Sequence, residues 1–218
     1  MRESAIRDFW TFEDDLAYYR LIRGAHALEV FNQSFFLGEF GTWQLGVGGV
    51  VVSKLPLEIK VARDAVAESE CPVWSGIRNV IEALAIRELT GASKLSDSQR
   101  KFLAIRIRSL MEWASEPKSW KAVELLTAPS GQHLPLSALA DYTRFVHIPE
   151  PGVLACAAHD KDGTFVVTDA LLDRFGTDSL DDWLALMSDA GLLPESYSVA
   201  DARDVTPRVT VVVASIPR

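Results

Sequence analysis

The clearest pattern along the chain is the recurrence of apolar residues at intervals of three and four, which places them on one face of a helix. Residues 75–89 show it best, through four apolar residues: Ile77, Val80, Ile81 and Leu84. Similar spacing predicts a series of helices: 11–32, 57–69, 75–89, 96–114, 118–126, 135–146 and 179–190. The middle of the chain is therefore expected to hold four or five helices.

Polar residues mark the start of three of these helices. A hydroxyl residue at a helix N-terminus and a polar residue three positions later can each bond the other's backbone amide, which is the capping box. Three pairs have this spacing or a variant of it: Thr11 and Asp14, Ser96 and Gln99, and Ser179 and Asp182. Each pair predicts that a helix begins directly after its first residue.

Strands are predicted where β-branched and aromatic residues gather, since these fit a pleated surface. Three segments qualify: 34–53, 153–168 and 208–216. The turn sequence HDKDG predicts a hairpin within the second, and TVVVA predicts a central strand in the third. The fold class is therefore α+β, a helical middle with a mixed β-sheet built from N-terminal and C-terminal strands.

We predict a single domain spanning 1–218. The one alternative is a sub-boundary near 148–152, where IPEPG places two prolines and a glycine together. The chain would then comprise a mainly helical part, 1–147, and a small α+β part, 152–218.

Three glycines in LGVGGVVV, namely Gly46, Gly48 and Gly49, resemble part of a phosphate-binding loop. Such a loop lies at the exit of a strand, where its amides can bond an anion. Here the glycines precede the valine run that forms the strand, and no Lys-Ser or Lys-Thr pair follows them. We interpret them as positions where a bulky residue packs across the strand, or as a bulge, and we expect no cofactor.

Composition is that of a globular protein, with 48% hydrophobic and 24% charged residues in 218. Cys71 and Cys156 are too few for a disulfide framework and are interpreted as reduced thiols. No uncharged apolar run reaches the length that spans a bilayer, and the first residues lack the apolar core of a signal peptide. The expected location is cytoplasmic, with no membrane contact.

Charge is unevenly distributed along the chain, whose formal net charge is −8. Residues 151–218 hold eleven acidic and five basic residues. Such a surface repels nucleic-acid phosphates and can attract a basic protein. The expected binding residues lie in and just before the 179–190 helix: Asp178, Asp181, Asp182 and Asp189.

The 96–114 helix is the most basic part of the chain, and Arg100, Lys101 and Arg108 can share one of its sides. Two interpretations are open, a small nucleic-acid patch or the solvated face of a helix whose other side is buried. We favour the solvated face, so nucleic acid is not the expected partner.

Metal and acid–base motifs are incomplete. The cluster CAAHDKD contains Cys156, His159, Asp160 and Asp162, but a structural zinc site usually needs a second ligand pair, which the sequence lacks. We interpret it as a turn with solvated acids and expect no metal. His133 and His159 are expected in solvated turns, and His147 at a helix end.

Arg20 and His26, in RLIRGAH, are separated by five residues. This spacing resembles the Arg-x4–6-His signature of HEPN-type ribonucleases, which are all-helical domains in which the pair acts on an RNA phosphodiester. The resemblance covers one predicted helix, and Leu21 stands where that family usually has a polar residue. The alternative interpretation is an interfacial arginine and a partly buried histidine, which we favour.

Two classes of function remain. The first is a non-catalytic protein that binds another protein, as an immunity, inhibitor or accessory protein does. The second is a HEPN-like ribonuclease that uses Arg20 and His26. We favour the first because the sequence contains no complete catalytic motif. A homo-oligomer is a further expectation, because three tryptophans have no evident core face: Trp10, Trp43 and Trp120.

Overall fold

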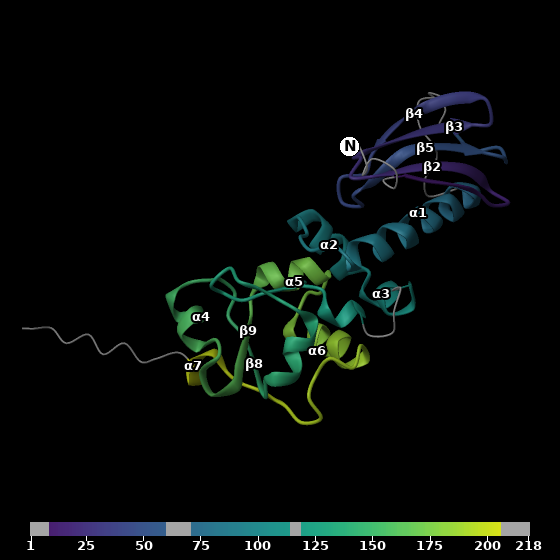
Figure 1. Cartoon of the computed structure of the whole chain (residues 1–218). Coiled ribbons are helices and arrows are strands. Elements are labelled where there is room, and N and C mark those ends of the chain that lie inside the picture. Colours follow the sequence, from purple (N-terminus) through teal and green to yellow (C-terminus); the bar gives the residue numbers. More distant parts are fainter. Residues whose placement is uncertain (1–8, 60–70, 114–118, 206–218) are drawn as a thin grey trace, which may run out of the picture. The chain divides into compact units, whose positions relative to one another are not determined.

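The computed structural model of the chain describes residues 9–59, 71–113 and 119–205 (Figure 1). The chain divides into two compact units, Met1–Trp120 and Lys121–Arg218, called here the N-terminal and C-terminal units. The fold class is α+β, as predicted. The single-domain organisation stays a prediction, which limited proteolysis would test.

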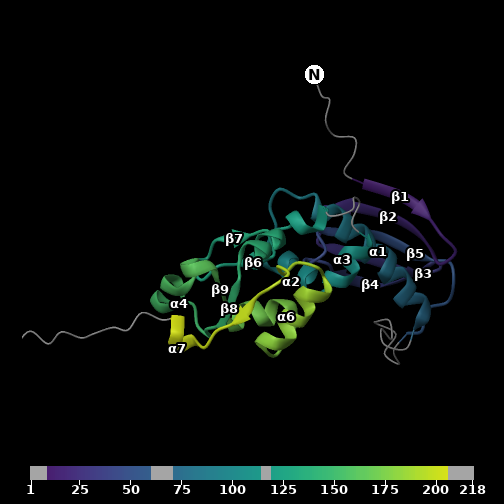
Figure 2. The same cartoon turned by 90° about the horizontal axis from the view of Figure 1, so that it is seen from below.

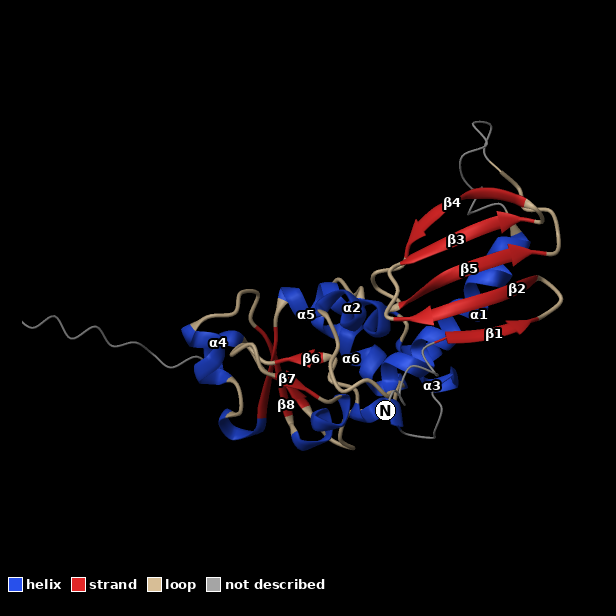
Figure 3. Ribbon diagram, turned by 45° about the horizontal axis from the view of Figure 1, so that its top comes forward, coloured by secondary structure: helices blue, strands red, loops and turns tan. Residues whose placement is uncertain are grey.

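The N-terminal unit contains a five-stranded mixed sheet in the order β1-β2-β5-β3-β4 (Figure 3). Its strands all come from the first part of the chain: β1 (Phe9–Glu13), β2 (Ala17–Arg23), β3 (Ala27–Asn32), β4 (Phe35–Gly41) and β5 (Val47–Ser53). Strand β5 is antiparallel to β2 and parallel to β3. The prediction of extended chain over 34–53 is confirmed, and the described C-terminal strands do not join this sheet but form two others, β10-β8-β9 and β6-β7.

The predicted helix over 11–32 is wrong, because this segment forms β1, β2 and β3. In β2 buried and exposed residues alternate, so that Tyr19 and Leu21 are buried while Tyr18 and Arg20 are exposed. The capping box predicted for Thr11 and Asp14 is also wrong, because Thr11 lies in β1 and Asp14 bonds amides that follow it, at the turn between β1 and β2. The Oδ1 of Asp14 accepts from the N–H groups of residues 16 and 17, at 2.8 Å each.

One face of the sheet packs against α1 (Pro72–Thr90), which runs along it in Figures 1 and 3. The rings of Phe40 in β4 and Trp74 in α1 are in contact, with their centroids 5.3 Å apart. The buried residues of this unit are mostly aliphatic: Leu21, Leu28, Val30, Val47, Val51, Ile77, Ile81 and Ile86. The helix predicted over 75–89 is confirmed.

The glycines of β5 are required by close approach of the neighbouring strands. A Cβ atom on Gly48 would overlap the carbonyl oxygen of Ala27, and one on Gly49 would overlap that of Arg20. Gly49 also has a φ of +121°, a conformation that other residues rarely adopt. Gly48 and Gly49 are therefore sites of close packing inside a strand, but the atoms nearest to them belong to the backbone of the neighbouring strands and not, as was predicted, to a bulky side chain.

Helices α2 (Asp97–Ile105) and α3 (Ile107–Trp113) occupy the range predicted as one helix, and both bonds of the Ser96–Gln99 capping box are present. The helix predicted over 57–69 is wrong where it can be examined, because residues 57–59 are not helical. The rest of that range lies outside the described residues. Pro72 occupies the first turn of α1, where its missing N–H costs nothing.

The C-terminal unit is built from short elements. Its helices are α4 (Val153–Ala158), α5 (Asp169–Phe175), α6 (Leu180–Asp189) and α7 (Ala202–Val205). Its strands are β6 (Leu126–Thr127), β7 (His133–Leu134), β8 (Arg144–His147), β9 (Thr164–Val167) and β10 (Ser198–Val199). Three short 3-10 helices complete it: Ser119–Ala122 at its border, Leu136–Asp141 and Lys161–Gly163.

A three-stranded parallel sheet, in the order β10-β8-β9, lies at the centre of this unit (Figure 2). Neighbouring residues of a strand face opposite sides, so Phe145 and Val146 enter different layers. Val146 packs with Ala155 and Ala158 of α4, whereas Phe145 and Phe165 contact Trp183 of α6. Helices therefore cover both faces of the sheet.

Several predicted elements of this unit need correction. Ranges 118–126 and 135–146 contain only short 3-10 turns and strands in place of helices. The segment 153–158 forms helix α4 and not the first arm of a hairpin, which fits the high helix propensity of its three alanines. The turn at HDKDG does exist, between α4 and β9. The strand predicted over 208–216 lies outside the described residues.

Candidate functional site

Helix α6 presents the predicted acidic residues to solvent. It begins after Ser179, whose hydroxyl accepts from the backbone N–H of Asp182 at 3.1 Å and donates to the Asp182 carboxylate at 2.6 Å. Trp183, Leu184 and Met187 are buried on the opposite side. The four predicted binding residues are all exposed: Asp178, Asp181, Asp182 and Asp189.

The acidic character extends beyond α6 to the whole segment 175–202, here called the acidic segment. It contains six carboxylates and no lysine, arginine or histidine. All six carboxylate residues are exposed: Asp178, Asp181, Asp182, Asp189, Glu195 and Asp201. A segment of 28 residues that carries charge of one sign only produces a strong local field.

The same segment exposes two larger side chains among its carboxylates. Tyr197 is 41% exposed, and Val199 is 53% exposed in β10, the edge strand of its sheet among the described strands. Their backbone is held by bonds from the N–H of Ser198 to the carbonyl of Thr143 and from the N–H of Ala200 to that of Phe145. The acidic surface therefore includes an apolar contact area on ordered backbone.

Arg20 and His26, the residues of the ribonuclease resemblance, lie on a strand and in a turn. Arg20 is an exposed residue of β2. His26 precedes β3, and its ring stacks on that of Trp43 with centroids 4.4 Å apart. The helix that the resemblance requires is absent here, since residues 9–32 form three strands.

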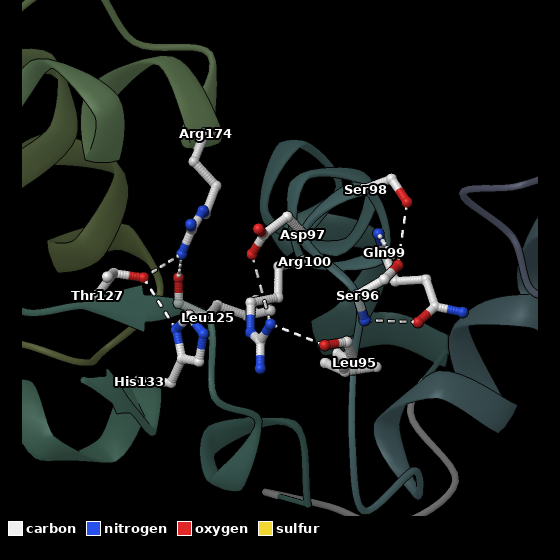
Figure 4. A network of polar contacts seen from close by, with 10 residues as sticks. All are labelled: Leu95, Ser96, Asp97, Ser98, Gln99, Arg100, Leu125, Thr127, His133 and Arg174. Atoms are coloured by element: carbon white, nitrogen blue, oxygen red, sulfur yellow. Dashed lines mark hydrogen bonds and ion pairs between the residues drawn. The ribbon is translucent and has the colours of Figure 1, made fainter. Parts of the chain in front are cut away.

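One of the three residues of the predicted basic patch, Arg100, is buried. Arg100 is 7% exposed, and its guanidinium donates to the carbonyl of Leu95 at 2.7 Å and pairs with Asp97 at 3.5 Å (Figure 4). Lys101 and Arg108 are exposed. Arg100 thus stabilises the start of α2 and is not part of an exposed basic surface.

The side chain of His159, expected in a solvated turn, is instead only 6% exposed. Its Nδ1 accepts from the backbone N–H of Val166 at 3.2 Å, so the proton of the neutral ring is on Nε2. Burial lowers the pKa of His159, although Asp160, 3.7 Å from Nε2, acts in the opposite direction. The histidine is therefore held neutral, because protonation of Nδ1 would break a bond to β9.

Asp160 also accepts from the hydroxyl of Tyr142 at 2.6 Å. Burial and the nearby carboxylate both raise the pKa of Tyr142 above its ordinary value. Asp160 and Asp162 both have positive φ, at 65° and 52°. Aspartate tolerates this conformation better than most residues, so Asp160 and Asp162 suit the backbone of the turn at HDKDG.

His133 and His147 each contact a polar side chain. Arg174 donates to the carbonyl of Leu125 and to the hydroxyl of Thr127, and that hydroxyl shares a second hydrogen bond with His133 Nδ1 at 3.1 Å, whose direction depends on the tautomer of the ring (Figure 4). This network links α5, β6 and β7. His147 lies in β8, not at a helix end, and pairs with Asp169 at 2.7 Å.

The remaining expectations concern metal binding, membrane crossing and oligomeric state. Among residues 9–59, 71–113 and 119–205, no three His, Cys, Asp or Glu side chains are grouped as a metal site would need. In the same part of the chain, no helix combines the length and apolarity that crossing a membrane requires. Trp43 is 64% exposed and Trp120 is buried, and homo-oligomerisation stays a prediction.

No protein-family model matches the sequence, and no curated protein matches it at a significant level. Any statement of function therefore depends on the residues themselves.

Proposed function

We propose that this protein acts by binding another protein, as an immunity, inhibitor or accessory protein does, and that its partner is basic. The observation that supports this proposal best is the acidic segment, with six exposed carboxylates and no basic residue over 175–202. Charge of one sign accelerates the encounter with a partner of opposite charge and disfavours nucleic acid.

The exposed Tyr197 and Val199 supply an apolar contact, which the charged residues do not. Charged groups at an interface contribute mainly to association rate and specificity, whereas aromatic and apolar side chains supply most of the affinity. Both residues lie between two of the carboxylates, Glu195 and Asp201. A basic partner would therefore find an acidic rim around an apolar contact.

The test compares two variants that each remove three charges. The first combines Asp178→Asn, Asp181→Asn and Asp189→Asn and leaves Asp182 to bond Ser179. The control combines Glu29→Gln, Glu39→Gln and Glu58→Gln, which are exposed residues of the N-terminal unit. Partners are captured from lysate at low and high salt and identified by mass spectrometry. Each is then purified and its Kd measured by calorimetry.

A basic partner should bind the parent and the control variant equally and the acidic-segment variant at least about tenfold more weakly, a difference of about 1.4 kcal/mol. Its affinity should also fall as salt rises. Equal binding to both variants would mean that these carboxylates serve solubility only, and the proposal would fail.

The ribonuclease alternative has its own decisive assay. Purified protein is incubated with single-stranded RNA beside the variants Arg20→Ala and His26→Ala. Cleavage that both substitutions abolish would establish an enzyme and overturn the binding proposal. We expect no cleavage by any of the three proteins, because the helical framework of that family is replaced by strands at this position.

A further inference from the structure

A cavity of about 520 Å³ lies inside the N-terminal unit, between the sheet, α1 and α2. Sites that bind small molecules typically measure roughly 300–1,000 Å³ and combine an apolar wall with a few polar groups. This cavity has both properties. It involves none of the residues of the acidic segment, so it is independent of the function proposed above.

The apolar wall is drawn from five parts of the unit. Its members are Leu28 of β3, Phe40 of β4, Leu45 of the turn between β4 and β5, both Trp74 and Ile81 of α1, and Phe102 of α2. Three of them are aromatic. At the solvent side, Ile105 of α2 also lines the cavity and is itself 50% exposed. The wall can therefore take an alkyl chain or a ring, and solvent can reach it past Ile105.

The charged residues that line the cavity are three cations and one carboxylate: Arg78, Lys101, Arg106 and Glu82. Glu82 accepts two bonds from Arg106, at 2.8 and 2.9 Å, and a longer one from Arg78 at 3.3 Å. The guanidinium of Arg106 also lies over the ring of Phe102, 4.4 Å from its centroid. These contacts fix the guanidinium groups, and the lining charge is positive.

Two polar atoms in the wall have no hydrogen-bond partner among the described residues, Thr42 Oγ1 and Trp74 Nε1. Leaving such a group buried and unpaired costs about 1–3 kcal/mol. Each exposes less than 1 Å², so a ligand would reach it only after a small side-chain movement. An oxygen atom on the ligand would supply the partner that each lacks.

We propose that this cavity binds a small amphipathic carboxylate. The apolar chain or ring lies against Phe40, Trp74 and Phe102, and the carboxylate lies at the cationic side formed by Lys101 and the arginines. Burial of the apolar part supplies most of the affinity, at roughly 25 cal/mol for each Å² removed from water. The cations select the charge of the headgroup.

Dodecanoate is the probe, and titration calorimetry on the full chain is the measurement. We expect binding in the roughly micromolar range, with weaker binding of dodecanol and of dodecyltrimethylammonium, which carry the same chain without the negative charge. The variant Ile105→Trp should fill the cavity and raise the Kd for dodecanoate at least about tenfold. Ser98→Trp, at another exposed lining residue, repeats that test should the first variant fold poorly.

Matched controls separate the cavity from the rest of the surface. Met111→Trp is the control for Ile105→Trp, because it adds the same side chain at an exposed position of α3 that does not line the cavity. A further variant, Lys101→Glu, reverses the charge of a lining residue, and Arg108→Glu is its control at another exposed position of α3 outside the cavity. Both controls should bind as the parent does, whereas Lys101→Glu should weaken dodecanoate and not dodecanol. Absence of dodecanoate binding, or equal binding to Ile105→Trp and Met111→Trp, would overturn the proposal.

Discussion

The two units are stabilised in different ways. The N-terminal unit has strands of five to seven residues and a mostly aliphatic core between its sheet and α1. The C-terminal unit has strands of two to four residues, and its core contains four aromatic rings in mutual contact: Phe145, Phe165, Phe175 and Trp183. The first depends on backbone pairing over long strands, the second on large side chains.

This difference predicts where each unit is vulnerable. A long sheet tolerates the loss of one side chain but not a change that separates two of its strands, because such a change breaks the backbone hydrogen bonds between them together. A unit with short strands has few backbone bonds to lose, so most of its stability comes from the apolar surface that its large residues bury. The following changes test this contrast.

The largest effect is expected from Trp183→Ala in the C-terminal unit. Trp183 is fully buried and stacks on Phe165, with ring centroids 6.0 Å apart. Its removal should cost about 3–5 kcal/mol in unfolding free energy, measured by denaturant titration. Trp43→Ala, at the exposed tryptophan that stacks on His26, is the control and should cost far less. Equal losses would contradict the role assigned to the aromatic core.

The next effect is expected from Gly48→Val in β5. Any Cβ at this position meets the carbonyl oxygen of Ala27, so β3 and β5 must separate. We expect a loss of about 1–3 kcal/mol or more in denaturant titration. Gly152→Ala is the control, since nothing lies within 4 Å of the atom it would add. A stable Gly48→Val protein would show that the sheet is not as tightly packed as its backbone indicates.

A smaller effect is expected from removing helix caps, one in each unit. Ser96→Ala breaks a complete capping box on α2, and Ser179→Ala removes the hydroxyl that caps α6. Each should lower the unfolding free energy by about 1 kcal/mol, with replacement by Asp nearly neutral. If Ser→Asp is as harmful as Ser→Ala, then the hydroxyl serves some purpose other than capping.

The smallest effect is expected from the titration of His159. Its pKa in the folded protein is lower than the ordinary value of 6.5, so the unfolded chain takes up the proton first as the pH falls. The stabilising contribution of the neutral ring is therefore complete above about pH 6.5 and declines below it. Unfolding free energy should fall with pH in this range for the parent.

His159→Asn is the matched variant, because its amide oxygen can accept from the Val166 N–H and does not titrate. The variant should lack the part of the pH dependence that His159 causes, while the carboxylates, which titrate at lower pH, remain the same in both proteins. Identical pH profiles would show that His159 takes up its proton equally in the folded and unfolded states.

The sequence predicted helices at α1, α2 and α6, and the caps of the last two, because those signals are local. Ile77 and Ile81 mark the buried side of α1, and the pair Ser96 and Gln99 forms the cap that its spacing predicts. The segment over 11–32 was mistaken for a helix for a physical reason. Tyr18 and Ile22 are apolar but exposed, so Arg20 is the one polar residue among the alternating exposed positions 18, 20 and 22 of β2, and the alternation is hard to read from the sequence.

The candidate sites differ in the same way. Exposure of the Asp residues around α6 followed from a local pattern, since they lie opposite Trp183 and Met187. The cavity could not be predicted, because Phe40, Trp74 and Phe102 come from separate elements and meet only after the sheet and helices have packed. Arg20 and His26 were expected on one helix, whereas Arg20 lies in β2 and His26 lies between β2 and β3.

Strand β5 lies between two hairpins, β1–β2 and β3–β4, that precede it in the chain. During synthesis each hairpin can form from neighbouring residues, but neither can join the other until the chain is complete through Ser53. The apolar faces of both hairpins therefore stay uncovered until β5 and α1 have been synthesised and have packed against them. Slow steps in folding are expected there, because the pairing of β2 with β5 joins distant residues.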